Sequence, residues 1–255
     1  MKTIILFIIS FSLLVQNAIA QQQPTDTTFG KSANYLGDGA IPDNSRTKLL
    51  PSLILPVALI GYGLTTLQNH GLYSSYQAKT DIQRAFGNQG APIDNYLVFS
   101  PYVEFGALVL FKVNCKNDMV NTLLIIGKSE ILMLAIVEPL KYITKEERPD
   151  HSDDLSFPSG HTAEAFEAAT IVYREFRYKS PWYGIGAYAL ATTVGMYRMI
   201  NNKHWESDVI VGAGIGILSA NLVYATHLYR WGRKDYCFMP MYNGTSQGLM
   251  FTCTL

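Results

Sequence analysis

Apolar segments of helical length recur along the chain, and this pattern restricts the fold more than any other feature of the sequence. Segments of this kind are typical of helices that pack in a bundle or cross a membrane. A further stretch, 162–176, is amphipathic, and its charged residues fall at helical spacing on one side. The pattern predicts an all-α protein, a bundle of about six helices. The apolar segments run from about 49 to 67, 102 to 113, 120 to 143, 182 to 200 and 209 to 228.

Both ends of the chain differ from this helical part. After Trp231, two short apolar runs flank Asn243 and Gly244, a dipeptide that favours a tight hairpin turn, so we expect a short β-like C-terminal tail. The stretch before the first apolar segment is polar. We therefore divide the chain into a signal peptide, a polar lead, a helical domain and a tail, at residues 1–20, 21–48, 49–230 and 231–255.

The first 20 residues resemble an export signal. Lys2 precedes an apolar run from Ile4 to Val15, which is followed by Ala18-Ile19-Ala20, a small-residue cleavage signature. The run is too short to span a bilayer comfortably, although an uncleaved anchor helix is the alternative. The sequence thus favours an exported protein.

The composition excludes some partners. Lys and Arg number 20, as do Asp and Glu, so the formal net charge is zero and the chain lacks the basic footprint of a nucleic-acid-binding protein. Charged residues make up only 16% of the chain, which leans towards a membrane location. The three cysteines form no metal-like cluster; Cys237 and Cys253 flank the tail and can either pair or remain thiols. The sequence carries no signal for an oligomeric state.

Positive charges on the connections indicate a topology. Basic residues crowd the connection at 174–179 and follow the last apolar segment at 230–234, and such charges favour the cytoplasmic side. Residues 144–160 and 201–208 then lie on the periplasmic side of a bacterial inner membrane. Six spans after a cleaved signal would place residues 144–160 inside instead. We therefore expect one segment, 102–113, not to span the membrane, because a span needs about 20 residues. The alternatives are a signal peptide that is retained, or a bundle that is wholly soluble or peripheral in the periplasm.

Three pieces of sequence carry the chemistry. The first is Lys141-Tyr-Ile-Thr-Lys-Glu-Glu-Arg148-Pro149, the second Phe157-Pro158-Ser159-Gly160-His161, and the third Arg198-Met-Ile-Asn-Asn-Lys-His204-Trp-Glu-Ser-Asp208. Lys and Arg supply fixed positive charge, and Arg can grip phosphate oxygens two at a time. Together the three pieces indicate a phosphate site.

The remaining residues of these pieces fit the same interpretation. Ser159 and Gly160 precede a helical stretch, whose first N–H groups attract anions. His204 and Asp208 are four apart, so the carboxylate can hold one imidazole nitrogen while the other attacks. His161 supplies a second imidazole for proton transfer.

The combined pattern resembles the signature of the type 2 phosphatidic acid phosphatase and vanadium haloperoxidase superfamily, which reads K-x6-R-P, P-S-G-H and S-R-x5-H-x3-D. The fixed positions match except the Ser before Arg198, which is Tyr197 here. The resemblance covers roughly residues 95–230, and the mismatch bears on the fine shape of the pocket. The resemblance implies the helical bundle fold of that superfamily.

The resemblance also implies roles. His204 is similar to the nucleophile that forms a phosphohistidine, Asp208 to its orienting carboxylate and His161 to the acid that protonates the leaving oxygen. No metal or other cofactor is implied, because fixed cations take its place, and vanadate is expected to inhibit. The residues that resemble the phosphate cradle are Lys141, Arg148, Ser159, Gly160 and Arg198.

We therefore predict a hydrolase, a metal-independent phosphomonoesterase acting on a lipid phosphate in a membrane. Candidate substrates are lipid A, undecaprenyl pyrophosphate, phosphatidylglycerophosphate and phosphatidate. A soluble periplasmic acid phosphatase for small phosphate esters is the main alternative, and a vanadium haloperoxidase is a further one. A cation site at His151 and the neighbouring aspartates is an alternative interpretation, but a solvated acidic loop is favoured because no ligand spacing is recognisable.

Overall fold

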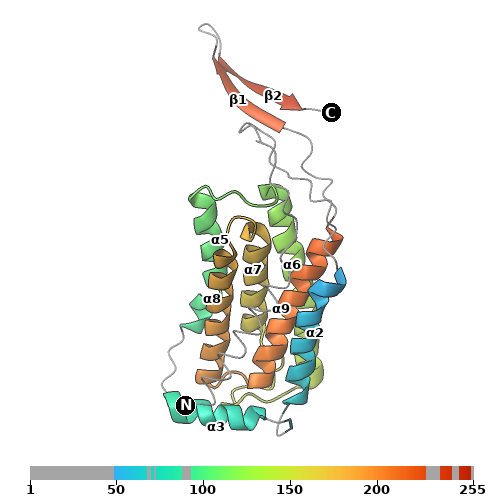
Figure 1. The fold of residues 1–255 in the computed structure, drawn as a ribbon, viewed down its shortest axis with the longest axis vertical. Helices are drawn as coiled ribbons and strands as arrows, with labels where there is room; N and C mark the ends of the chain where they lie inside the picture. Colours follow the sequence, from blue (N-terminus) through green and yellow to red (C-terminus); the bar gives the residue numbers. More distant parts are fainter. Residues whose placement is uncertain are drawn as a thin grey trace.

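The computed structural model describes residues 49–67, 70–71, 73–87 and 93–227, together with the backbone of two strands. Within this part the fold is a helical bundle followed by a two-stranded antiparallel sheet, which confirms the predicted all-α bundle with a β-like tail (Figure 1). The strands are β1 (Tyr236–Tyr242) and β2 (Gln247–Cys253), paired with Tyr236 opposite Cys253. The helices are α2 (Leu49–Thr65), α3 (Ser75–Phe86), α4 (Asp94–Leu97), α5 (Ser100–Leu110), α6 (Met119–Thr144), α7 (Gly160–Phe176), α8 (Pro181–Ile200) and α9 (Glu206–Thr226).

Helix α7 lies in the middle of the bundle and packs against α5, α6, α8 and α9. Its charged residues are largely buried rather than turned to solvent, which corrects the amphipathic interpretation of this stretch. Arg174 donates to Asn221, and Glu175 accepts hydrogen bonds from Asn117 and Tyr224. Partners on neighbouring elements therefore replace water for Arg174 and Glu175, whereas the carboxylate oxygens of the buried Glu167 have no hydrogen-bond partner among the described residues.

Glycines let α7 and α9 approach closely. A Cβ atom on Gly212 would lie 2.5 Å from the carbonyl oxygen of Ser159, and one on Gly216 would lie 2.1 Å from that of Ala163. Both contacts are far below van der Waals distance, so only glycine fits at these two positions. The small residues at 212–216 thus serve close helix packing.

The chain runs along the bundle from one end to the other through α4 and α5. Asp94 binds Arg198 at the end of the bundle that carries the three motifs, which we call the motif end. At the opposite end the backbone N–H of Lys116 donates to the carbonyl of Glu175. Helix α5 alone has 11 residues, but α4 and the turn after it extend the path. Segment 102–113 thus runs from near the motif end towards the opposite end of the bundle, and the expectation that it does not span a membrane stays a prediction.

This path fixes which connections share an end. Residues 144–160 and 201–208 lie at the motif end, whereas the basic connection at 177–180 lies at the opposite end (Figure 1). The start of α2 and the end of α9 also lie opposite the motif end, because Asn221 donates to the carbonyl of Ser52 while Gly63 packs against Ser207 and Val211. The expected signal peptide and polar lead fall outside the described residues, as do the side chains of Cys237 and Cys253.

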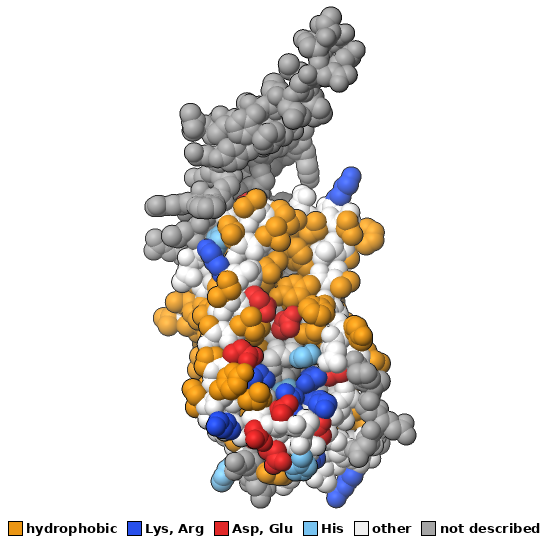
Figure 2. Space-filling model, turned by 180° about the vertical axis from the view of Figure 1, so that it is seen from behind, with side chains coloured by type: hydrophobic (Ala, Val, Ile, Leu, Met, Phe, Trp, Pro, Cys, Tyr) orange, Lys and Arg blue, Asp and Glu red, His pale blue; other side chains and the backbone are white. Residues whose placement is uncertain are grey.

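Much of the bundle surface is apolar. Helices α6 and α9 are long and apolar enough to cross a membrane, and α2 is a shorter apolar helix. Large apolar side chains are exposed on α2, α5 and α6, and in Figure 2 they cover the middle of the molecule while charged and histidine side chains gather towards the motif end. Such a surface is typical of a bundle placed in lipid. Examples are Leu50, Ile54, Val103, Leu110, Ile131 and Ile143.

We expect Gly216→Ala to destabilise the protein by about 1–3 kcal/mol or more, because the added methyl group must push α7 away from α9. Gly127→Ala on α6 is the matched control. Nothing lies within 4 Å of a Cβ there, so its stability should be unchanged or slightly higher. Thermal unfolding of both variants in detergent micelles measures the difference, and equal melting temperatures would contradict the close packing.

Candidate active site

The three motifs meet at one end of the bundle although they lie far apart in the sequence. Lys141 is in the last turn of α6, and Arg198 is in the last turn of α8. His161 and Asp208 lie in the first turns of α7 and α9, and His204 is in the short connection between α8 and α9. The packing of the helix ends, not the local sequence, therefore assembles the site.

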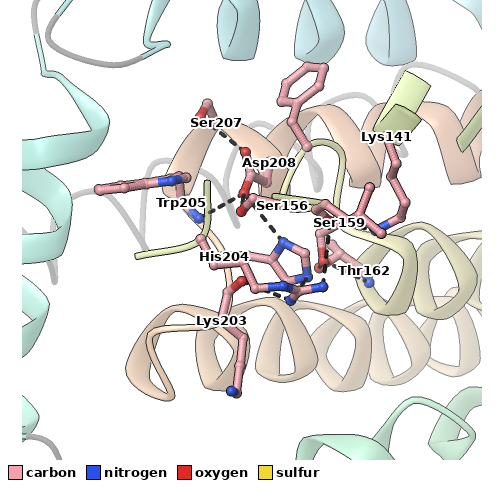
Figure 3. Close-up of polar contacts among 12 residues, drawn as sticks. Lys141, Ser156, Ser159, Thr162, Lys203, His204, Trp205, Ser207 and Asp208 are labelled. Carbon is pink, nitrogen blue, oxygen red and sulfur yellow. Dashed lines mark hydrogen bonds and ion pairs between the residues drawn. The ribbon is translucent and has the colours of Figure 1, made fainter. Parts of the chain in front are cut away.

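His204 and Asp208 form a buried pair. The Nδ1 atom of His204 lies 3.3 Å from Oδ2 of Asp208, and both side chains are nearly inaccessible to solvent. The same carboxylate oxygen accepts a hydrogen bond of 2.5 Å from the Ser156 hydroxyl and one of 2.9 Å from the backbone N–H of Trp205, as Figure 3 shows. Asp208 is thus held from several sides, and it in turn orients the imidazole.

The other imidazole nitrogen faces a cation. The Nε2 atom of His204 lies 3.3 Å from Nη1 of Arg148. A guanidinium can only donate, so these contacts require Nε2 to carry the lone pair and Nδ1 to carry the proton donated to Asp208. Burial lowers the pKa of His204 well below its ordinary value, and the positive charges of Arg198, Arg148 and Lys141 lower it further. The imidazole is therefore neutral at physiological pH, with a lone pair on Nε2.

Each arginine of the site is paired with a carboxylate. Arg148 binds Asp153 through Nε at 2.6 Å and donates through Nη1 to the carbonyl of Lys203 at 3.0 Å. Arg198 donates through Nη1 to Asp94 at 2.6 Å, and this pair is buried. The second oxygen of Asp94 accepts from the side-chain amide of Asn201 at 2.8 Å. These contacts fix the two guanidinium groups in place.

Two residues that position the charged groups of the site, Asp94 and Ser156, were not predicted from the sequence. Asp94 stands about 100 positions before Arg198, and no motif marks it. Ser156 lies just before the second motif, where a lone serine gives no signal. A pattern search along the chain finds groups at short, fixed spacing, whereas both residues act across the fold.

Lys141, Ser159 and Gly160 lie beside the histidines. The Lys141 ammonium donates to the carbonyl of Leu155 at 3.1 Å, and its Cε would lie 3.9 Å from a Cβ on Gly160. Ser159 is the N-cap of α7: its hydroxyl pairs with that of Thr162, and its backbone N–H donates to the carbonyl of Asp208. In this structure the backbone N–H of Ser159 therefore joins α7 to α9, while its hydroxyl caps α7 by accepting from the backbone N–H of Thr162.

A cavity of about 420 Å³ opens beside these residues. His161 and both arginines line it, together with residues of α4, of the loop after Arg148 and of the connection after α8. Tyr197, which replaces the serine of the signature, is not among the lining residues, so the mismatch does not reach the cavity wall.

The acidic loop is tied to basic side chains. Glu147 binds His151, Asp150 binds Lys203 and Asp153 binds Arg148, each at 2.6 Å. Although burial acts to raise the pKa of Asp150, hydrogen bonds from Lys203 and Ser152 lower it to about 2. Among the described residues, no group of three His, Cys, Asp or Glu side chains has the arrangement of a metal site. These pairings give no support to the cation-site interpretation of His151 and its neighbours.

Comparison with known proteins adds two relatives. A segment of 93 residues is 45% identical to the lipid A 1-phosphatase of Porphyromonas gingivalis, covering 36% of this chain and 21% of that protein. A segment of 77 residues is 36% identical to the bacitracin transport permease protein BcrC of Bacillus licheniformis, covering 30% of this chain and 36% of that protein. The chain thus matches only about a fifth and about a third of the lengths of these relatives.

Two solved structures are similar in part. One is the crystal structure of Aquifex aeolicus LpxE, with 21% identity, a TM-score of 0.44 and coverage of 62% of this chain and 98% of that one. The other is the first transmembrane PAP2-type phosphatidylglycerolphosphate phosphatase from Bacillus subtilis, with 20% identity, a TM-score of 0.43 and coverage of 66% and 94%.

The family comparison covers the part of the chain that holds the three motifs. The family model of the PAP2 superfamily matches residues 122–232, which include both histidines, Asp208 and the basic residues gathered around them. Residues 122–232 therefore match the PAP2 superfamily, as the three motifs predicted.

Proposed function

We propose that this protein removes the phosphate group from a lipid phosphate through a phosphohistidine intermediate. One observation carries the proposal: the Nε2 lone pair of His204 lies among fixed cations while Nδ1 is held by Asp208. This arrangement provides a neutral, oriented nucleophile at a place that attracts an anion. The match of residues 122–232 to the PAP2 superfamily supports a hydrolase acting on phosphoric esters.

In the proposed reaction, Nε2 of His204 attacks phosphorus and the bond from phosphorus to the leaving oxygen breaks. Burial and the charge of Arg198 lower the pKa of His161 to about 4 in the free site, so His161 takes up a proton as the phosphate anion binds and gives this proton to the leaving oxygen. A water molecule then attacks the phosphohistidine, His161 takes the proton of this water, and inorganic phosphate leaves. Lys141, Arg148, Arg198 and the N-terminus of α7, at Ser159 and Gly160, stabilise the charge on the phosphoryl oxygens, a task that metal ions perform in other phosphoryl-transfer sites.

A lipid A-type phosphate is the substrate that we favour. The 93-residue segment that matches a lipid A 1-phosphatase supports this choice. The apolar surface of the bundle supports a substrate that is itself anchored in the bilayer. We further propose that the motif end faces the periplasm, since the basic connection at 177–180 lies at the opposite end.

Replacement of either histidine should abolish phosphate release. We expect His204→Ala and His161→Ala each to lower turnover by at least about a thousandfold, because both imidazoles take part in making and breaking bonds. His70→Ala is the matched control, since His70 is an exposed residue between α2 and α3. Trapping of acid-labile phosphate on the wild type but not on His204→Ala tests the intermediate; a His204→Ala enzyme with more than a thousandth of wild-type turnover would rule out this nucleophile.

Activity should not depend on a divalent metal. The fixed cations supply the positive charge, so we expect full activity in excess EDTA and inhibition by vanadate, which can occupy the transferring phosphoryl position. Phosphate release is measured in both conditions after extensive dialysis. Loss of activity in EDTA that is restored by Mg²⁺ or Zn²⁺ would contradict the proposed cradle.

The orientation can be tested with single cysteines in a background that lacks the three native ones. Asp154→Cys reports on the motif end without disturbing the Asp153 pair with Arg148, and Lys179→Cys reports on the opposite end. We expect an impermeant thiol reagent to label position 154 but not 179 in cells with an intact inner membrane. Labelling at both positions, with release into the soluble periplasmic fraction, would instead indicate an exported enzyme that does not span.

A further inference from the structure

Helix α3 lies across the motif end, crosswise to the long helices of the bundle (Figure 1). Its buried Ile82 packs with Met199 of α8 and Val209 of α9. The side-chain amide of Gln83 adds a hydrogen bond of 2.9 Å to the side-chain oxygen of Asn202. Apolar packing and a polar contact therefore fix α3 to the elements around the connection between α8 and α9.

Two side chains of α3 contact Trp205, the residue that follows His204. The Lys79 ammonium lies 5.1 Å from the centroid of the Trp205 ring, and the ring of Tyr76 lies 4.8 Å from the same ring, centroid to centroid. Tyr76 and Lys79 are three positions apart and so share one face of the helix. A cation over an indole and a pair of tilted aromatic rings are both attractive contacts. The neighbour of the proposed nucleophile is thus held from α3.

The Lys79–Trp205 pair also holds the backbone on both sides of Arg148. The Lys79 ammonium donates to the carbonyl of Pro149 at 2.8 Å, and the indole N–H of Trp205 donates to the carbonyl of Glu147 at 2.7 Å. Neither Lys79 nor Trp205 is among the residues that line the cavity. The pair therefore contacts the loops that carry the reacting groups, and not the space that the substrate would enter.

We propose that Lys79 and Trp205 are positioning residues, which hold the guanidinium of Arg148 against Nε2 of His204. These two groups are 3.3 Å apart and come from separate loops, which the pair joins at the adjacent positions. Alignment matters here because a displacement of about 1 Å can lower a rate about a hundredfold. The inference rests on the proposed function, and it adds to the site a helix that lies outside residues 122–232.

The test measures kcat and KM of Lys79→Ala with lipid A or phosphatidate, whichever the wild type hydrolyses faster. We expect kcat to fall about tenfold with KM nearly unchanged, because Arg148 and His204 lose their alignment while the cavity keeps its lining. Inhibition by vanadate, which must meet both groups at once, should weaken by a similar factor. Lys79→Arg should restore most of kcat, since a guanidinium can also donate to the Pro149 carbonyl and lie over the indole.

Trp205→Phe is a second, milder variant. It keeps an aromatic ring beside Lys79 and Tyr76 but loses the N–H that donates to Glu147, so kcat should fall about fivefold, again without a change in KM. This variant decides the question if Lys79→Ala does not fold. An unchanged kcat in Trp205→Phe would then count against the proposed role.

Arg84→Ala is the matched control. It removes one positive charge from the same helix, but the Arg84 side chain is 77% exposed and its ion pair is with Asp81 of α3 itself. Its kcat, and its inhibition by vanadate, should stay close to those of the wild type. The melting temperatures of Arg84→Ala and Lys79→Ala should be similar, because Ile82 keeps α3 in place in both.

An unchanged kcat in Lys79→Ala, a loss confined to KM, or a loss that Lys79→Arg does not restore would overturn the positioning role. Hydrolysis by the wild type would still uphold the phosphatase in each of these cases. A wild type that hydrolyses neither lipid and does not bind vanadate would instead reject the proposed function itself.

Discussion

The buried carboxylate of Asp208 is the contact on which the motif end depends. It lies where α9 begins, and its side chain accepts hydrogen bonds from Ser156 before α7 and from Trp205, besides holding His204. The carbonyl of the same residue accepts from the backbone N–H of Ser159. A buried carboxylate is tolerated only with such partners. The same bonds therefore join the starts of α7 and α9 and orient the imidazole.

The close packing of α7 and α9 makes this arrangement possible. Gly212 lets the carbonyl of Ser159 approach the backbone of α9 one turn after Asp208, and Gly216 continues the contact one turn further. In addition to this contact between α7 and α9, the buried Arg198–Asp94 pair connects α8 to α4. The positions of the charged groups are thus determined by helix packing, so the site is formed before any substrate arrives, a condition for effective electrostatic stabilisation.

The sequence was informative where function or burial imposes a short, local pattern. The apolar segments predicted the helices, and the three motifs predicted which residues gather, since each motif keeps its members within a few positions. It was less informative about relations across the fold. Nothing near Asp94 indicates that Arg198 will be its partner, and the length of segment 102–113 does not show that α4 extends the path of the chain along the bundle. The charges of α7 also gave no sign that residues such as Asn221 would meet them inside the bundle.

The neighbouring positions of the start of α2 and the end of α9 have a consequence for how such a bundle is combined with other domains. The amide of Asn221 reaches the carbonyl of Ser52, so the chain enters and leaves the bundle at adjacent places, at the end remote from the histidines. A unit with adjacent entry and exit points can be inserted into a longer polypeptide, or joined to a partner on either side, without disturbing its interior. Sequence added before α2 or after α9 would therefore lie at the end of the bundle remote from the motif end.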